Sequence, residues 1–286
     1  MGSGTGSDHD KWLKAEQLPR FKPWFFALPV DFLALFWVQE ISDSGMLPSM
    51  PRANRYFVPG RCYHLTHRCH DRKFLLRFAQ DRQYYRQIVW RSRERFAVEI
   101  FSYCIPSNHT HFLVRAKDGD LISQWMQQIE GEFAQWYNRR QKRSGAFWEG
   151  RYHSTMIEPG QHLWRCMAYI ELNMVRAGVV SHPAQWPWCS YVEWMGRRQR
   201  YGLVNKKACL ELLGQAELTT FQQNYSHLIE EILAQDGCRR EPAWTESIAV
   251  GSPQFIGEIK DAVEWRRRFE IQEVAGEGWA LASIQK

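Results

Sequence analysis

The sequence predicts an α+β protein with a ferredoxin-like β-α-β-β-α-β core, one further helix that closes this core, and a mainly helical C-terminal extension. Two observations predict this class. Between residues 63 and 177, the apolar side chains switch between the alternation of a strand and the spacing of a helix. Turn-forming residues separate these segments, and their order is that of the split β-α-β arrangement.

The first half of the core is predicted to contain three strands and a helix. Residues 63–68 alternate in polarity and predict a strand, whereas residues 79–96 carry apolar side chains at helical spacing. Two further strands are predicted at 98–105 and 109–115. The residues Pro-Ser-Asn at 106–108 predict a turn between them, so these strands are expected to form a hairpin.

The second half of the core is predicted to contain a helix, a strand and the closing helix. Residues 121–142 have an apolar stripe and predict a helix. The fourth strand is expected at 152–157. Residues 161–177 predict the closing helix, and Gly178 directly after them is a typical helix stop.

We predict three regions in the chain. These are a poorly ordered N-terminal extension at 1–50, a core domain at 51–204 and a mainly helical C-terminal extension at 205–286. Within the C-terminal extension, helices are expected at 205–235 and near 252–267, followed by a terminal hairpin. This extension contains no catalytic pattern, and it is expected either to pack on the core or to regulate access to it.

Charge is distributed unevenly along the chain. Residues 51–205 contain 24 Lys and Arg against 12 Asp and Glu, a net charge of +12. Residues 1–50 contain 4 basic and 6 acidic side chains, and residues 206–286 contain 9 and 13, so both flanks are acidic. A basic centre is typical of a domain that binds nucleic acid, although charge that only confers solubility would give the same counts.

Two observations concern the location of the protein. Residues 24–38 are apolar, but they are interrupted by Asp31 and are shorter than the about 20 residues that a spanning helix needs. The seven cysteines are an odd number without a CxxC pair, which favours reduced thiols over a disulfide framework. We therefore expect a cytoplasmic protein without a membrane segment.

The first candidate for a site is the pair of histidines in His109-Thr110-His111. Residues i and i+2 of a strand point to the same face, so the two imidazoles can hold one divalent metal. An isolated HxH pattern is short, and it more often marks two ordinary histidines of a sheet.

The second candidate is Tyr169 together with Asn173. Their i, i+4 spacing places both on one face of the closing helix, and Arg165 and Arg176 flank the same face. Taken alone, this face is better explained as a solvated surface with Tyr169 as a half-buried anchor.

Together, the two candidates fit one reaction. A tyrosine hydroxyl has a pKa near 10 and is a poor nucleophile at neutral pH. It becomes effective when a metal polarises a scissile phosphate and basic groups offset the developing charge. If the closing helix packs on the sheet, Tyr169 approaches the two histidines and Asn173 can donate a third metal ligand. The product would be a 5′-phosphotyrosine and a free 3′-hydroxyl.

Basic side chains also lie on both sides of the predicted fourth strand. We expect them to contact DNA phosphates, with Trp148 or Phe147 stacking on bases. A solvated helix end, favoured by the helix dipole, is the alternative explanation. The predicted phosphate contacts are Arg139, Arg140, Lys142, Arg143 and Arg151.

A run of three histidines, His64, His67 and His70, suggests a second metal site. Spacing of three along a strand places the rings on both faces of the sheet, so we do not expect them to share a metal.

Four ordered segments between residues 51 and 180 resemble the REP-associated tyrosine transposases, a branch of the single-tyrosine, IS200-like HUH transposase superfamily. The segments are YHLTHRCHDRKFLL, YCIPSNHTHFLVR, SGAFWEGRYHS and YIELNMVRAGVV. This bacterial family differs from the present sequence at three positions. Thr110 stands between the histidines where a bulky apolar residue is usual, Met174 stands where a proline is common, and Cys69 replaces a usual glycine.

The resemblance implies that residues 51–204 form an HUH catalytic domain with Tyr169 as the nucleophile. It implies Mg²⁺ or Mn²⁺ as the cofactor, held by His109, His111 and Asn173. The implied partner is single-stranded DNA with hairpins of the repetitive extragenic palindrome type, bound by a nucleoid-associated monomer or homodimer. DNA contacts are expected from the basic residues named above and from Trp148, Arg165 and Arg176.

Three functions remain to be separated. The leading hypothesis is a transposase that cleaves and rejoins single-stranded DNA. The first alternative is a domesticated protein that recognises palindromic repeats without cutting them. The second is a metal-dependent nuclease that uses water, in which Tyr169 has only a structural role.

Overall fold

The computed structural model describes residues 56–198, 200–235, 238–263, 269–274 and 278–283. The N-terminal extension predicted at 1–50 lies outside the described residues. Residues 53–286 form one compact unit. No helix in the described ranges has the length and apolar character required to cross a bilayer.

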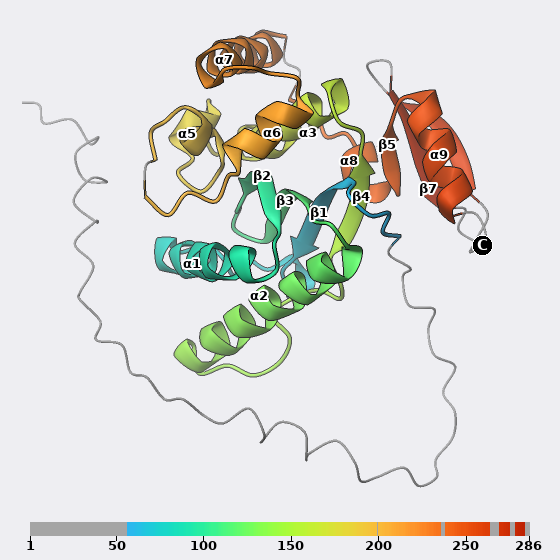
Figure 1. Cartoon of the computed structure of the whole chain (residues 1–286). Coiled ribbons are helices and arrows are strands. Elements are labelled where there is room, and N and C mark those ends of the chain that lie inside the picture. Colours follow the sequence, from blue (N-terminus) through green and yellow to red (C-terminus); the bar gives the residue numbers. More distant parts are fainter. Residues whose placement is uncertain (1–55, 199, 236–237, 264–268, 275–277, 284–286) are drawn as a thin grey trace, which may run out of the picture. The chain divides into compact units, whose positions relative to one another are not determined.

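A seven-stranded mixed sheet lies at the centre of this unit (Figure 1). Its strand order is β2-β3-β1-β4-β5-β7-β6, and the pairs are antiparallel except for the parallel pair of β4 and β5. The strands are β1 (Cys62–Arg68), β2 (Glu99–Cys104), β3 (His109–Arg115), β4 (His153–Ile157), β5 (Ala249–Gly251), β6 (Phe269–Val274) and β7 (Gly278–Ser283).

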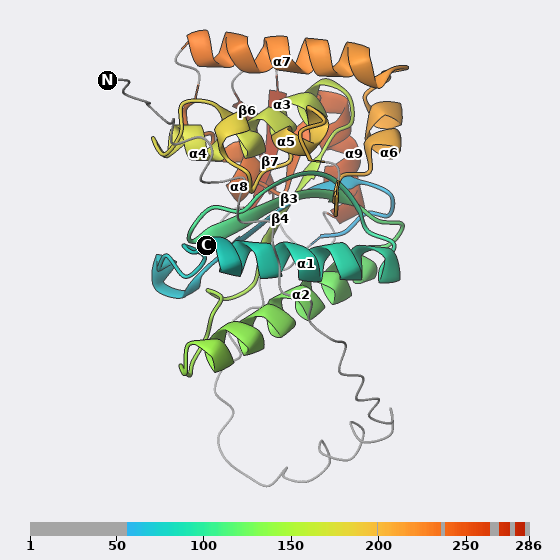
Figure 2. The same ribbon diagram turned by 90° about the vertical axis from the view of Figure 1, so that its left-hand side faces the viewer.

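Helices cover both faces of the first four strands, as Figure 2 shows. One face packs against α1 (Ala79–Arg95) and α2 (Gly119–Arg140). The other carries α3 (Gln161–Glu171), α4 (Asn173–Arg176), α5 (Tyr191–Trp194), α6 (Lys206–Leu212) and α7 (Leu218–Ala234). The predicted α+β class is confirmed, and the chain order from β1 to β4 is the predicted strand, helix, strand, strand, helix, strand.

Alternation along the strands divides the buried side chains between two cores. In β3, Phe112 and Val114 belong to the core beneath α1 and α2, whereas Leu113 belongs to the core beneath α3. His111 lies on the same side as Leu113, because side chains two residues apart share a face.

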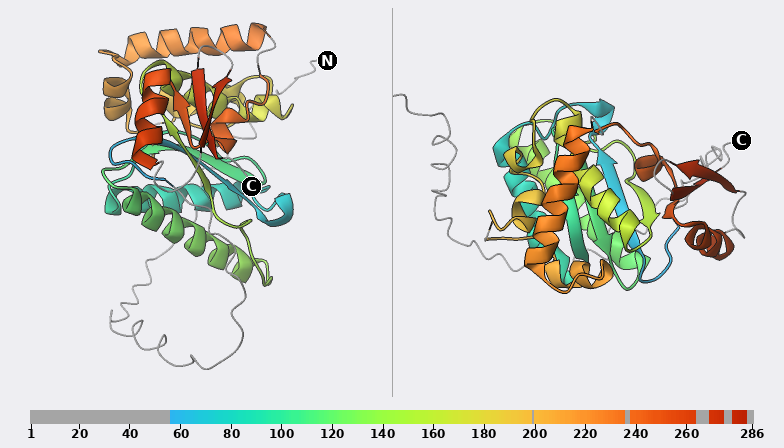
Figure 3. Two further views of the ribbon diagram at one scale, coloured as in Figure 1. Left: turned by 90° about the vertical axis from the view of Figure 1, so that its right-hand side faces the viewer. Right: turned by 90° about the horizontal axis from the view of Figure 1, so that it is seen from above.

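The C-terminal segment continues the sheet beyond β4 (Figure 3). Helices α6, α7 and α9 (Pro253–Val263) and the β6–β7 hairpin lie where the sequence predicts helices and a hairpin. Strand β5 was not predicted, because three residues are too short to show an alternation. The division into three regions, with a boundary at 204/205, stays a prediction.

The closing helix predicted at 161–177 is divided in two, and the single helix is a wrong prediction in this respect. Helix α3 ends at Glu171 and α4 begins at Asn173. Between them, Leu172 has a ψ of 3°, although its amide still donates to the carbonyl of Ala168 at 2.9 Å. Tyr169 therefore lies in the last turn of α3, and Asn173 begins the next segment.

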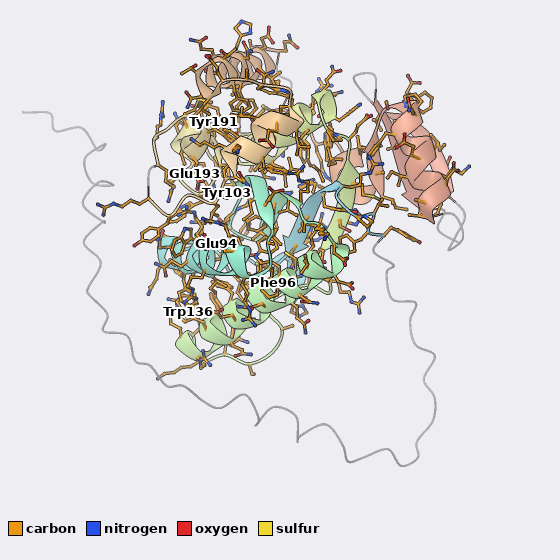
Figure 4. The ribbon with its side chains drawn as sticks, in the orientation of Figure 1. Glu94, Phe96, Tyr103, Trp136, Tyr191 and Glu193 are labelled. Carbon is orange, nitrogen blue, oxygen red and sulfur yellow. The ribbon has the colours of Figure 1, made fainter. Side chains whose placement is uncertain are left out.

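A buried ion pair connects helix α5 to helix α1. The guanidinium of Arg86 lies 3.1 Å from the carboxylate of Glu193, to which the hydroxyl of Tyr103 also donates at 2.6 Å. Tyr103 and Glu193 are labelled in Figure 4, in strand β2 and helix α5. Both partners of the ion pair are almost fully buried, so removal of either one would leave an uncompensated charge.

Candidate active site

Two histidines and an asparagine converge on the face of the sheet that α3 covers. His109 and His111 come from the start of β3, and Asn173 comes from the start of α4. The side-chain nitrogen of Asn173 lies 3.3 Å from Nε2 of His109 and 3.0 Å from Nε2 of His111. The structure thus brings together the three side chains that the sequence proposed as metal ligands.

A third histidine, His64 of β1, orients His111. Its Nδ1 lies 2.8 Å from the carbonyl oxygen of Trp244, and its Nε2 lies 2.8 Å from Nδ1 of His111. A carbonyl oxygen can only accept, so His64 carries its proton on Nδ1 and accepts the Nδ1 proton of His111. Nε2 of His111 is therefore left with a free lone pair, directed at Asn173.

Burial keeps these imidazoles neutral. Desolvation lowers the pKa of His64 to about 3 and that of His109 to about 4, and the pKa of His111 is well below its usual value. His109 has its own orienting partner, because its Nδ1 lies 2.7 Å from the side-chain oxygen of Asn108. Neutral rings with oriented Nδ1 protons present their Nε2 lone pairs to a metal.

Tyr169 lies beside this cluster. Its ring centroid is 6.4 Å from that of His111 and 6.1 Å from that of His64, and the residue is only 7% exposed. Desolvation raises the pKa of its hydroxyl, while the charge of Arg176 and a hydrogen bond with Thr245 act in the opposite direction.

Arg176 is a cation in direct contact with Tyr169. Its guanidinium lies 4.0 Å above the ring of Tyr169, and the same charge helps to lower the pKa values of His109 and His111. Its Nη2 atom is buried and has no hydrogen-bond partner among the described residues. A buried, unpaired donor beside a nucleophile is suited to an anionic ligand.

Helix α8 (Ala243–Glu246) closes the site from the C-terminal segment. The ring of Trp244 lies 6.2 Å from that of Tyr169, and Ser247 accepts hydrogen bonds from Thr155 and His153 of β4 through its carbonyl. The sequence did not indicate these contacts. They show that part of the C-terminal segment packs on the core, which was one of its two expected roles.

Arg165, expected beside Tyr169, is directed toward the C-terminal segment. It is half-buried, and its guanidinium lies 3.9 Å from the carboxylate of Glu241. In the described conformation, Arg165 is therefore close to a protein carboxylate.

The proposed phosphate contacts fall into two groups. Arg139, Lys142 and Arg151 are exposed. In contrast, Arg140 is paired with Asp81, and Arg143 donates to the side-chain oxygen of Asn138 at 2.8 Å. Within the part of the chain that the structure describes, the exposed group makes no such internal ion pair or side-chain hydrogen bond. The internal pairing of the other two was not visible in the sequence.

Trp148 lies in the core rather than on the surface. It is 9% exposed, its indole NH donates to the carbonyl of Glu130 at 3.1 Å, and its ring stacks on His67 at 4.5 Å. Phe147 is buried as well. Base stacking by Trp148 would therefore require this packing to open.

The histidine run of β1 is divided as expected. His64 faces α3, whereas His67 faces α2 and lies 2.8 Å from the carboxylate of Glu130. Across the described ranges, no three His, Cys, Asp or Glu side chains are arranged to hold a metal. The candidate metal centre thus depends on the amide of Asn173 as its third group.

Part of the chain also matches a known protein family. Residues 58–173 match the family model described as "Transposase IS200 like". The predicted resemblance to the REP-associated tyrosine transposases, within the IS200-like transposases that act on DNA, is confirmed.

One curated relative and two solved structures are similar to the chain. A Haemophilus influenzae (strain Rd) protein named as a REP-associated tyrosine transposase is 27% identical over 154 residues, which cover 50% of this chain and 86% of the relative. The structure of a REP-associated tyrosine transposase bound to a REP hairpin matches with a TM-score of 0.45 and 19% identity, covering 52% of this chain and 87% of the other. A Deinococcus radiodurans R1 protein named as a transposase matches with a TM-score of 0.29 and 16% identity, covering 35% and 82%.

Proposed function

We propose that this protein cleaves and rejoins single-stranded DNA through a covalent bond to Tyr169. The observation that carries the proposal is the position of Tyr169, with its ring beside His111 and beneath the guanidinium of Arg176. A tyrosine with only a structural role would not require a cation whose buried Nη2 atom has no hydrogen-bond partner among the described residues.

The same residues fit a divalent metal, Mg²⁺ or Mn²⁺. Nε2 of His109 and Nε2 of His111 converge on the Asn173 amide, which presents its oxygen in place of its nitrogen after a rotation about one bond. When bound, the cation would polarise the scissile phosphodiester. The neutral state of both rings suits this role, because a protonated imidazole cannot be a ligand.

The bonds that form and break can be described for the protein's own side chains. The Tyr169 oxygen loses its proton and forms a bond to phosphorus, while the bond from phosphorus to the 3′-oxygen breaks and that oxygen takes up a proton. Nη2 of Arg176 would donate to a non-bridging phosphate oxygen and offset its growing charge. The products are a 5′-phosphotyrosine and a free 3′-hydroxyl, from which the strand can be rejoined.

We infer that β1–β4, α1 and α2 form a ferredoxin-like domain, supported by the strand order β2-β3-β1-β4 with antiparallel pairs. The substrate that we infer is a single strand with hairpins of the extragenic palindrome type, and the protein is expected in the cytoplasm. The exposed side chains of Arg139, Lys142 and Arg151 are available for its phosphates.

Labelled hairpin oligonucleotides test the proposal. With Mg²⁺, we expect a covalent adduct on denaturing gels that carries the 3′ label, and we expect Tyr169→Phe to abolish it. Tyr84→Phe is the matched control, because Tyr84 lies in α1 on the opposite face of the sheet and its stacking on Trp136 does not need the hydroxyl. Cleavage by Tyr169→Phe without an adduct would instead indicate a nuclease that uses water.

One observation favours the non-cleaving alternative. Tyr169 is only 7% exposed, and Trp244 is one of the side chains packed against its ring, so Trp244 limits the access of a phosphodiester. Trp244→Ala would open the site while keeping the backbone carbonyl that orients His64. Hairpin binding without an adduct, in both the wild type and Trp244→Ala, would support a domesticated DNA-binding protein.

A further inference from the structure

The segment between β1 and α1 lies directly beside the candidate metal ligands. Its residue Arg72 accepts a hydrogen bond from the Asn108 side chain at 3.3 Å, and Cys69 donates to the Asn108 carbonyl at 2.8 Å. The same Asn108 side chain orients His109. One residue therefore joins this segment to the site.

Two aromatic rings of this segment face solvent. Phe74 is 66% exposed and Phe78 is 46% exposed, whereas Leu76 between them is fully buried. The amide of Leu76 donates to the carbonyl of Ser107 at 2.8 Å, so the backbone that carries the two rings is fixed to the hairpin before β3. Exposed aromatic rings on a fixed backbone provide a preorganised contact surface.

Basic side chains are frequent in the segment that carries these rings. Arg68, Arg72, Lys73 and Arg77 are exposed, and Asp71 is the single carboxylate between residues 68 and 78. The guanidinium of Arg77 lies 4.5 Å from the ring centroid of Phe78. Cations and aromatic rings in one place suit a ligand that has both phosphates and flat bases, and they suit an apolar protein surface poorly.

We propose that Phe74 and Phe78 form a stacking platform for unpaired bases of the DNA strand that enters the site. The inference rests on the proposed function for its substrate class. It assigns base stacking to these two exposed rings, since Trp148 and Phe147 are buried. Each base has a π-face, so the platform holds a single strand without selecting one base.

Binding of a labelled single strand and of a blunt hairpin to the full chain tests the platform. Anisotropy is measured with EDTA in a Tyr169→Phe background, so that cleavage plays no part. We expect Phe74→Ala or Phe78→Ala to weaken single-strand binding by roughly 5- to 100-fold, as aromatic–base stacking energies imply. Binding of the blunt hairpin should change less than twofold. A strand with 2-aminopurine should show quenching that is lost in both variants.

Two further variants keep the test decisive. Phe74→Tyr retains a ring and should bind the single strand like the wild type, and Ile271→Ala removes an exposed apolar side chain from β6 as a matched control. Single-strand affinity within twofold of the wild type in Phe74→Ala/Phe78→Ala would overturn the inference. A change in the oligomeric mass of that double variant, with unchanged single-strand affinity, would also overturn the inference. It would indicate that a second copy of the chain covers the rings. A wild type that binds the strand through these rings but never forms the adduct would refute the proposed function alone.

Discussion

The two faces of β1 and β3 differ in the kind of side chain that they bury. Toward α1 and α2, the buried side chains are mainly aromatic and aliphatic, and Phe112 and Phe133 lie in one contiguous core. Toward α3, the buried set includes His64, His111 and Glu171. Burial of ionisable groups is unfavourable, whereas burial of apolar area is favourable. Both faces bury an apolar core that contributes to stability, and the α3 face in addition holds the chemical groups of the site.

Truncation of a core ring should have the largest effect on stability. Phe133 is fully buried and contacts the rings of Tyr85, Phe147 and Trp148, so Phe133→Ala leaves a large cavity. We expect a loss of about 3–5 kcal/mol in the free energy of unfolding, measured by urea denaturation. The fraction that remains folded should still form the adduct. A loss below about 1 kcal/mol would contradict the assignment of stability to this face.

The two histidines of β1 provide a second test, with an intermediate effect. His64→Ala removes the group that orients His111, and we expect Mn²⁺ affinity to fall about 10- to 100-fold in calorimetry. His67→Ala is the matched control, because His67 comes from the same strand but packs against Trp148 on the opposite face. Equal metal affinities for the two variants would show that His64 contributes no more to metal binding than His67 does.

The smallest expected effect is on the pH dependence of the free energy of unfolding. Burial raises the pKa of Glu171 to about 8, against the lowering influence of hydrogen bonds with Ser190 and Tyr225. Because this folded-state pKa lies above the unfolded value, the folded protein retains a proton that the unfolded chain loses. The stabilisation that protonated Glu171 contributes to the folded state is fully present below pH 4.5 and is lost as pH rises toward about 8.

We therefore expect the free energy of unfolding to fall by on the order of 1 kcal/mol per pH unit between pH 6.5 and 8. Glu171→Gln cannot titrate, so its stability should be flatter over that range. Parallel pH profiles of the two proteins would exclude Glu171 as the source. The measurement uses urea denaturation at each pH with EDTA present.

Much of the arrangement could be predicted from local patterns. The i, i+2 spacing of His109 and His111 correctly implied a shared face, and the position of Asn173 implied that it would meet them. The sequence did not lead us to predict that His64 orients His111, although it contains a signal for this contact. The predicted β-α-β-β-α-β order places β1 beside β3, and alternation then brings His64 to the face of His111.

Other features depended on contacts that no local pattern contains. Trp148 lies in a basic, aromatic run that suggested a surface, but its burial depends on α2 and on His67. The position of Trp244 follows from the parallel pairing of β5 with β4, which joins segments about 90 residues apart. Such pairings are determined by tertiary packing rather than by residue spacing.

The contact between His64 and the carbonyl of Trp244 spans 180 positions of the chain. During synthesis, β1 to β4 leave the ribosome long before residue 244, and domains can begin to fold as they emerge. His111 therefore acquires this set of orienting partners only after residue 244 has been added. A polypeptide that terminates before residue 244 would carry Tyr169 without the carbonyl that orients His64, so the proposed cleavage would require the synthesis of this later segment.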